Sequence, residues 1–197
     1  MRTIGITAAA LALAAMTALA GCGAKGGGPT PEGTFRLYKS AMSDRNFEDV
    51  WGMLSAASQE RMNQDAAVLS AQAEKAEGPG RKALDDTARL IGMTLEQMTK
   101  MDGRTFFVGL LKMAAETGRE DMDKLARAEI SRVETQGQSA QVFIKADGVE
   151  QTDRPMPLVK EGGRWKVDLV GAAASLPPLK GLDVPKIPVP EAPHETP

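Results

Sequence analysis

The sequence predicts an α+β fold in which helices come first and an antiparallel sheet of about four strands follows. Apolar residues recur at helical spacing from about residue 31 to residue 117. After about residue 125, apolar and polar residues alternate, which is typical of half-buried strands. Helices and strands in separate blocks favour an α+β architecture, and the segment 31–176 is long enough for one hydrophobic core.

Three helices are predicted at the start of this domain. Thr30-Pro31 supplies a favourable N-cap and first helical residue, and a helix with an apolar stripe should follow to about residue 43. The run 47–54 is apolar at positions i, i+3, i+4 and i+7, which predicts a second, short helix. Ser55 should cap a third, mostly polar helix that extends to about Glu77.

Three further helical segments are predicted before the strands. Gly78-Pro79-Gly80 should stop the third helix, and a fourth should cover 81–91. Residues 94–97 have a capping-box pattern, which predicts a short helical turn. The segment 106–114 is the most apolar helix of the set, and Gly118 should end it.

The predicted strands are joined by turns that contain glycine. The turns at 136–138 and 161–163 are short enough to connect neighbouring strands as a meander. Pro155 and Pro157 are two residues apart, so their missing N–H groups face one side, which predicts a sheet edge or a bulge. The four strands are expected around 129–134, 140–146, 156–160 and 165–169.

The ends of the chain differ in composition from this domain. Residues 1–21 combine a charged start with an apolar, alanine-rich run, which is typical of a cleaved secretory signal. The run is too short and too rich in alanine for a confident membrane-spanning helix. Residues 22–30 are glycine-rich and are expected to form a flexible tether. Residues 177–197 carry seven of the twelve prolines, which predicts an extended, disordered tail.

The signal ends in a motif that contains the only cysteine of the chain: Leu19-Ala20-Gly21-Cys22. This motif resembles the lipobox of bacterial lipoproteins. The resemblance implies that Cys22 carries a diacylglycerol group, that cleavage occurs between Gly21 and Cys22, and that the new amine is acylated. Several acyl chains would give a stable membrane anchor in the bacterial envelope. An aspartate at position 23 would resemble an inner-membrane retention signal, so Gly23 favours the outer membrane, with the domain facing the periplasm. The alternative is an ordinary cleaved signal followed by an unrelated cysteine.

Charge argues against one class of partner. Cleavage before Cys22 would leave 176 residues with 23 lysines and arginines against 26 acidic residues, because Arg2 leaves with the signal. The mature chain has no basic cluster, so nucleic-acid binding is not expected. With a single cysteine, no disulfide can form within the chain.

Two segments carry a second resemblance. Thr30–Leu54 is similar to the opening helix pair of the nuclear-transport-factor-2-like superfamily, which includes SnoaL-like domains. Met156–Leu169 resembles the closing hairpin of small bacterial lipoproteins in that superfamily. The resemblance covers about a third of the mature chain and implies a curved, cone-like sheet wrapped by helices around a pocket. Residues 56–127 are longer and more helical than the family pattern.

Few groups suited to catalysis are present. The only histidine, His194, lies in the proline-rich tail, and no phosphate-loop or nucleophile motif occurs. We therefore predict no catalytic residue, no metal site and no cofactor. The acidic run 120–123 lacks the glycine and distal glutamate of a calcium loop, so it is interpreted as a solvated charge run.

The leading hypothesis is a lipid-anchored, non-catalytic module that binds a small apolar ligand or an envelope protein. Tyr38, Trp51 and Trp165 are the candidate wall of a ligand pocket, although packing in the core would also explain them. One alternative is a small acid/base isomerase or dehydratase in which Tyr38 acts with Asp44 or Asp168. Another is a structural envelope lipoprotein whose tail reaches a partner.

Overall fold

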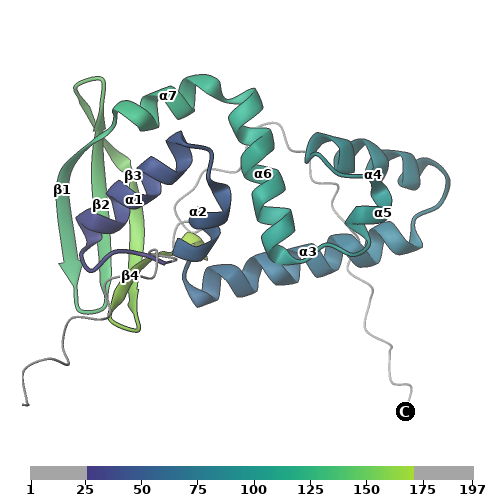
Figure 1. Cartoon of the computed structure of the whole chain (residues 1–197), viewed down its shortest axis with the longest axis horizontal. Helices are drawn as coiled ribbons and strands as arrows, with labels where there is room; N and C mark the ends of the chain where they lie inside the picture. Colours follow the sequence, from purple (N-terminus) through teal and green to yellow (C-terminus); the bar gives the residue numbers. More distant parts are fainter. Residues whose placement is uncertain (1–25, 171–197) are drawn as a thin grey trace, which may run out of the picture.

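The computed structural model describes residues 26–170, which contain seven helices and a four-stranded antiparallel sheet (Figure 1). The helices are α1 (Pro31–Ser43), α2 (Phe47–Met53), α3 (Ala56–Lys75), α4 (Gly78–Leu90), α5 (Leu95–Met98), α6 (Gly103–Thr117) and α7 (Arg119–Arg127). The strands are β1 (Glu129–Gln136), β2 (Ser139–Ala146), β3 (Val149–Glu161) and β4 (Arg164–Val167). The predicted α+β order is confirmed. The lipobox and the proline-rich tail lie outside the described residues.

The sheet is the predicted meander, in the order β1-β2-β3-β4. Between the pairs Val142–Met156 and Ile144–Gln151, residues 152–155 of β3 bulge opposite Phe143 alone. β4 pairs only with the last four residues of β3, so residues 149–157 have no strand on that side in the described chain. Both interpretations of the two prolines therefore hold, because Pro155 lies in the bulge and Pro157 lies where the sheet edge begins.

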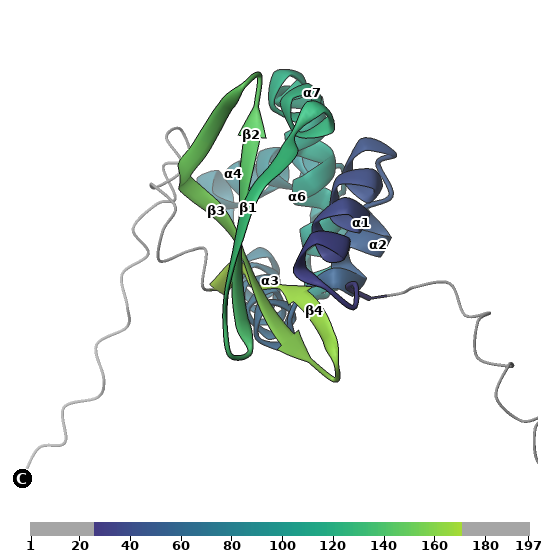
Figure 2. The ribbon, with the colours of Figure 1, turned by 90° about the vertical axis from the view of Figure 1, so that its left-hand side faces the viewer.

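One face of the sheet packs against helices, and we call the side chains buried between this face and the helices the sheet core. Figure 2 shows α1 and α2 on the same side of the sheet, with α7 at its far end. Large apolar side chains from helices and strands fill this layer, including Phe35, Val50, Leu54, Val142 and Leu158. The layer joins segments from both ends of the domain, because α1 and β4 contact each other directly.

A second group of helices, which we call the lobe, extends away from the sheet. The buried side chains of this group form the lobe core. α3 runs along the bottom of the view in Figure 1, with α4 and α5 at its far end and α6 crossing back toward the sheet. This core is small and rich in alanine and methionine, and consists of Ala66, Ala73, Ala88, Ile91, Leu95, Met98 and Met101. α6 contributes to both cores, because Phe107 packs in the sheet core and Phe106 packs against the lobe core.

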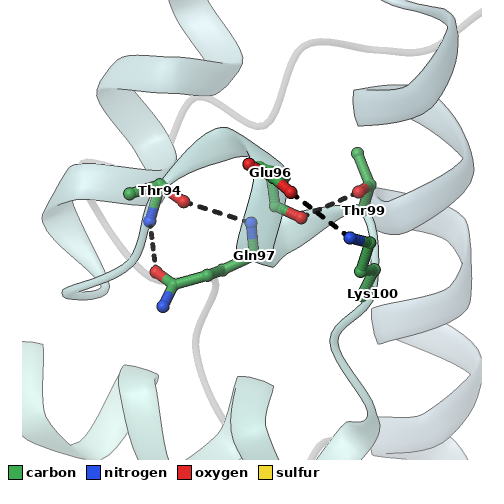
Figure 3. Close-up of polar contacts among 5 residues, drawn as sticks. All are labelled: Thr94, Glu96, Gln97, Thr99 and Lys100. Atoms are coloured by element: carbon green, nitrogen blue, oxygen red, sulfur yellow. Dashed lines mark hydrogen bonds and ion pairs between the residues drawn. The ribbon is translucent and has the colours of Figure 1, made fainter.

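The short helix α5 is held by the predicted capping box (Figure 3). The Gln97 backbone N–H donates to Thr94 Oγ1 at 3.2 Å, and the Thr94 N–H donates to Gln97 Oε1 at 2.8 Å. At the other end, Thr99 Oγ1 donates to the Glu96 carbonyl at 2.8 Å, and Lys100 pairs with the Glu96 carboxylate. A four-residue helix is thus satisfied at both ends by its own neighbours.

Two helices differ from the sequence prediction. Gly78 and Pro79 begin α4 instead of only stopping α3, because a proline in the first turn loses no helical hydrogen bond. The acidic run 120–123 lies within α7, a helix that the sequence did not predict. Met122 and Leu125, three residues apart, pack against the sheet core and give α7 its apolar side.

Candidate functional site

A buried run of three glycines, which we call the glycine strap (Gly26–Gly28), lies against β4. The Trp165 N–H donates to the Gly28 carbonyl at 2.9 Å, and the Gly28 N–H donates to Thr34 Oγ1 at 2.8 Å. Arg164 Nε donates to the Gly27 carbonyl at 2.7 Å. This differs from the flexible tether expected over residues 22–30, because its second half belongs to the folded domain.

Only glycine fits this path. A Cβ atom on Gly27 would overlap the backbone carbonyl of Trp165, and one on Gly28 would lie 2.8 Å from the Thr34 nitrogen. Gly26 has a φ of +140°, which side chains of L-residues rarely adopt. The glycines that suggested flexibility in the sequence are therefore required for close packing.

The side chains of Thr34 and Lys166 lie against the strap, between α1, α2 and β4. Thr34 Oγ1 is fully buried and lies 3.1 Å from the Trp165 carbonyl oxygen, which accepts its hydrogen bond. Lys166 Nζ donates to the Gly52 carbonyl at 2.7 Å, and partial burial lowers the pKa of this amine. Gly26 lies beside both Lys166 and Gly52, so the described part of the chain begins where α2 ends against β4.

A hollow of about 460 Å³ lies near the other end of the sheet, between α7 and the β2–β3 hairpin. Its lining is mostly apolar and consists of Lys124, Leu125, Ile144, Ala146, Asp147, Val149 and Gln151. The Val149 side chain is 63% exposed, so part of the apolar lining faces solvent. The size suits a small molecule or a protruding side chain of a partner.

The three aromatic residues predicted to line a pocket lie in or against the sheet core, and none of them lines this hollow. Tyr38 is half-buried on α1, and its burial raises the pKa of the phenol. Trp51 packs on Phe107 with their ring centroids 5.8 Å apart. Trp165 is 5% exposed and belongs to the core itself. All three therefore contribute to packing.

The groups considered for acid/base chemistry are spread over the domain. Asp44 is the exposed C-cap of α1 and accepts a hydrogen bond from Ser40 Oγ at 3.1 Å. Asp168 follows β4 and accepts the Val170 N–H at 3.2 Å. No hydrogen bond connects Tyr38 with either carboxylate. Among the side chains that the structure describes, those of residues 26–170 without 119–121, 153 and 154, no cluster of three acidic, histidine or cysteine residues could hold a metal.

A buried polar junction that the sequence did not predict joins α3 to the end of β4. Ser55 and Ser58 are fully buried, and their hydroxyl oxygens lie 2.7 Å apart. Ser58 Oγ accepts the Leu169 N–H at 2.8 Å, and the Ser55 N–H donates to the Val167 carbonyl at 2.8 Å. Only the N-cap role of Ser55 was visible in the sequence. Complete burial makes this junction a structural connection, closed to any substrate.

Comparisons with protein-family models, curated proteins and solved structures gave no match. The nuclear-transport-factor-2-like resemblance therefore stays a prediction. The two segments that carry it lie side by side, since Leu54 forms a parallel bridge with Val167. In the described residues, none of the helices is both long enough and apolar enough to cross a membrane.

Proposed function

We propose that the protein is a lipid-anchored lipoprotein of the bacterial envelope whose domain is a non-catalytic binding or interaction module. The observation that carries the anchor is the motif Leu19-Ala20-Gly21-Cys22 at the end of a signal-like apolar run. A cysteine thiolate is the side chain best suited to accept a lipid near neutral pH, and this chain has one cysteine. The proposed location is the outer membrane, with the domain facing the periplasm.

The binding role is supported by the hollow between α7 and the β2–β3 hairpin. Apolar side chains, including Val149 and Ile144, meet solvent there in a concave surface. A small apolar ligand or an apolar side chain of an envelope protein fits this chemistry. The acid/base alternative has less support, because Tyr38 packs against the sheet core while Asp44 is solvent-exposed.

Lipidation is tested with the full chain expressed in a bacterium. We expect the N-terminal peptide of the mature protein to begin at Cys22 and to carry the mass of a diacylglycerol and an amide-linked acyl chain. The Cys22→Ser variant should lose that mass and move from the detergent phase to the aqueous phase. Lys25→Ala, outside the motif, is the matched control and should behave as the wild type. Cleavage elsewhere, with an unmodified Cys22, would contradict the proposal.

Binding at the hollow is tested by native mass spectrometry of the detergent-solubilised full chain. We expect an added mass that denaturation releases and that the Val149→Arg variant loses. Val68→Arg is the matched control, because Val68 is also exposed, at 54%, but lies on α3. Equal retention in both variants would place any ligand elsewhere. A protein crosslink lost only in Val149→Arg would instead identify the partner as a protein.

A further inference from the structure

We infer that the glycine strap keeps the connection between the lipid anchor and the folded domain short. As a result, the α2–β4 end of the domain lies against the membrane surface. This inference rests on the proposed lipidation of Cys22. Its partner is the phospholipid headgroup layer that carries the anchor. Three features support it: the short chain between Cys22 and Gly26, the contacts of the strap, and the positions of α3 and β3 relative to the strap.

The docked strap leaves few residues between Cys22 and the folded domain. Four residue steps separate Cys22 from Gly26, and a fully extended chain covers at most about 3.6 Å per step, or about 14 Å in total. If the whole segment from Cys22 to Pro31 were free, nine steps would span about 32 Å. Docking therefore reduces the maximum reach of the anchor by more than half.

The strap is held as part of the fold. Its backbone forms hydrogen bonds with β4 on one side and with α1 on the other, through Trp165 and Thr34. Arg164 adds a third bond, to the Gly27 carbonyl. Because these groups are buried or partly buried, releasing the strap would leave polar backbone groups without partners. The exit point at Gly26 is thus fixed relative to the sheet.

A fixed exit point also fixes which surfaces lie far from the membrane. α3 begins next to the exit, where Ser55 bonds to Val167, and its 20 residues carry the far end of the lobe about 30 Å away. On the sheet, Lys160 pairs with Trp165 beside the strap, and the neighbouring Val159 pairs with Ser139. Gln151 of the hollow pairs with Ile144, five residues further along β2, so the hollow lies roughly 17 Å from this level of the sheet. The hollow and the lobe tip therefore stay accessible to partners in the periplasm.

The test uses the lipidated full chain in vesicles of phosphatidylethanolamine and phosphatidylglycerol that contain a lipid with a nitroxide headgroup. The Cys22 sulfur is occupied by the lipid, so one fluorophore can be placed on an introduced cysteine. Ala57→Cys reports near the exit and Lys82→Cys reports on α4; both positions are exposed. We expect several-fold stronger quenching at position 57 than at position 82.

The decisive comparison lengthens the connection between Cys22 and the glycine strap. An insertion of about 12 glycine and serine residues between Lys25 and Gly26 adds a mean span of roughly 20 Å, so quenching at position 57 should fall several-fold. The same insertion within residues 177–197 is the control and should change nothing. Gly27→Ala should release the strap and lower quenching as well, whereas Gly80→Ala, with open space around its Cβ, should not.

The outcomes separate this inference from the proposed function. If Cys22 carries no lipid and the protein does not bind the vesicles, the proposed function fails. Two results with a lipidated, vesicle-bound protein would overturn the inference. One is quenching at position 57 that the insertion after Lys25 does not change, and the other is quenching at position 57 equal to that at position 82. If Gly27→Ala does not fold, the insertion, which leaves every residue of the domain in place, still decides.

Discussion

The sheet core and the lobe core differ in the side chains that fill them and in the sequence distance that those side chains bridge. Ten of the sixteen buried residues of the sheet core are phenylalanine, leucine, valine or tryptophan, and the other six are alanine or methionine. Its polar contacts join residues as far apart as Thr34 and Trp165. The lobe core contains three alanines and two methionines among seven buried residues, all within positions 66–101. The sheet core therefore joins residues from the two ends of the domain, whereas the lobe core joins residues that are close in the sequence.

This difference predicts unequal stability within one domain. Hydrophobic stabilisation follows the apolar area buried, so alanine contributes much less than phenylalanine or leucine. Methionine is flexible and fills irregular spaces without fixing a single packing. The lobe should therefore open locally at a lower free energy than the sheet core, and opening of the sheet core should coincide with global unfolding.

The largest expected effect comes from removing one large side chain from each core. Phe35→Ala should lower the free energy of unfolding by about 3–5 kcal/mol, because it leaves a cavity among buried strands and helices. Met98→Ala should cost about 2–3 kcal/mol, and mainly in the lobe. Urea unfolding measures the first, and hydrogen exchange by mass spectrometry locates the second. Uniform acceleration of exchange in Met98→Ala would show that the two cores unfold as one.

A second comparison exchanges two helical glycines for alanine. At Gly103 the new Cβ would lie 2.5 Å from the Asn63 nitrogen, so α6 would have to move away from α3, at a cost of about 1–3 kcal/mol. At Gly80 nothing lies within 4 Å, and alanine should stabilise α4 by about 0.5–1 kcal/mol. The two variants should thus shift the urea midpoint in opposite directions. Equal shifts would mean that α3 and α6 do not pack as closely as described.

The periodicity of the sequence predicted the sheet and most helices, because apolar spacing and turn chemistry act locally. The Thr94 capping box and the paired prolines are examples of signals confined to a few residues. Tertiary contacts leave no such local signal. Glycine-rich sequence indicates a flexible linker when read alone, and only the carbonyl of Trp165 shows why Gly27 must lack a side chain. The charged α7 was missed because two apolar residues were too few to indicate a helix.

The same limits apply to the candidate site. The hollow combines residues from α7, β2 and β3, whose spatial proximity depends on the β2–β3 hairpin and cannot be read from spacing. Trp51 and Trp165 lie on apolar stripes, which is compatible with a pocket wall and with core packing, and the structure packs both in or against the sheet core. The motif Leu19-Ala20-Gly21-Cys22, for which we propose lipidation, is contiguous, so sequence alone suffices to predict that role.

Two buried or partly buried serines test whether the sheet side depends more on polar connections than the lobe. Ser58→Ala removes the acceptor of the Leu169 N–H and a partner of Ser55, so it should cost about 1–3 kcal/mol. Ser70 Oγ donates to the Met98 carbonyl at 2.8 Å in the lobe, and Ser70→Ala should cost about 0.5–1.5 kcal/mol. Urea titrations of both variants give the comparison. A larger loss of unfolding free energy in Ser70→Ala than in Ser58→Ala would show that the lobe depends more on polar connections than the sheet side does.

The smallest effect concerns the N-terminus of α6, which connects the regions. The Thr105 N–H donates to Asp102 Oδ1 at 2.7 Å, and this bond lowers the pKa of the Asp102 carboxyl. A lowered pKa means that the carboxylate adds stability above its ordinary pKa and that this contribution is lost as pH falls through the lower, folded value. Since Asp102 is exposed, the contribution should be only a few tenths of a kcal/mol.

The Asp102→Asn variant isolates this contribution, because an asparagine accepts the same bond at every pH but carries no charge. The wild type should be slightly more stable than the variant at pH about 7. The difference should shrink as the pH falls below about 4, the ordinary pKa of aspartate, and vanish below the lowered pKa of the folded state. Urea unfolding of both proteins across this range measures it. A difference that stays constant with pH would show that the charge of Asp102 does not stabilise α6, and that the helix depends on the capping hydrogen bond and on its apolar contacts with both cores.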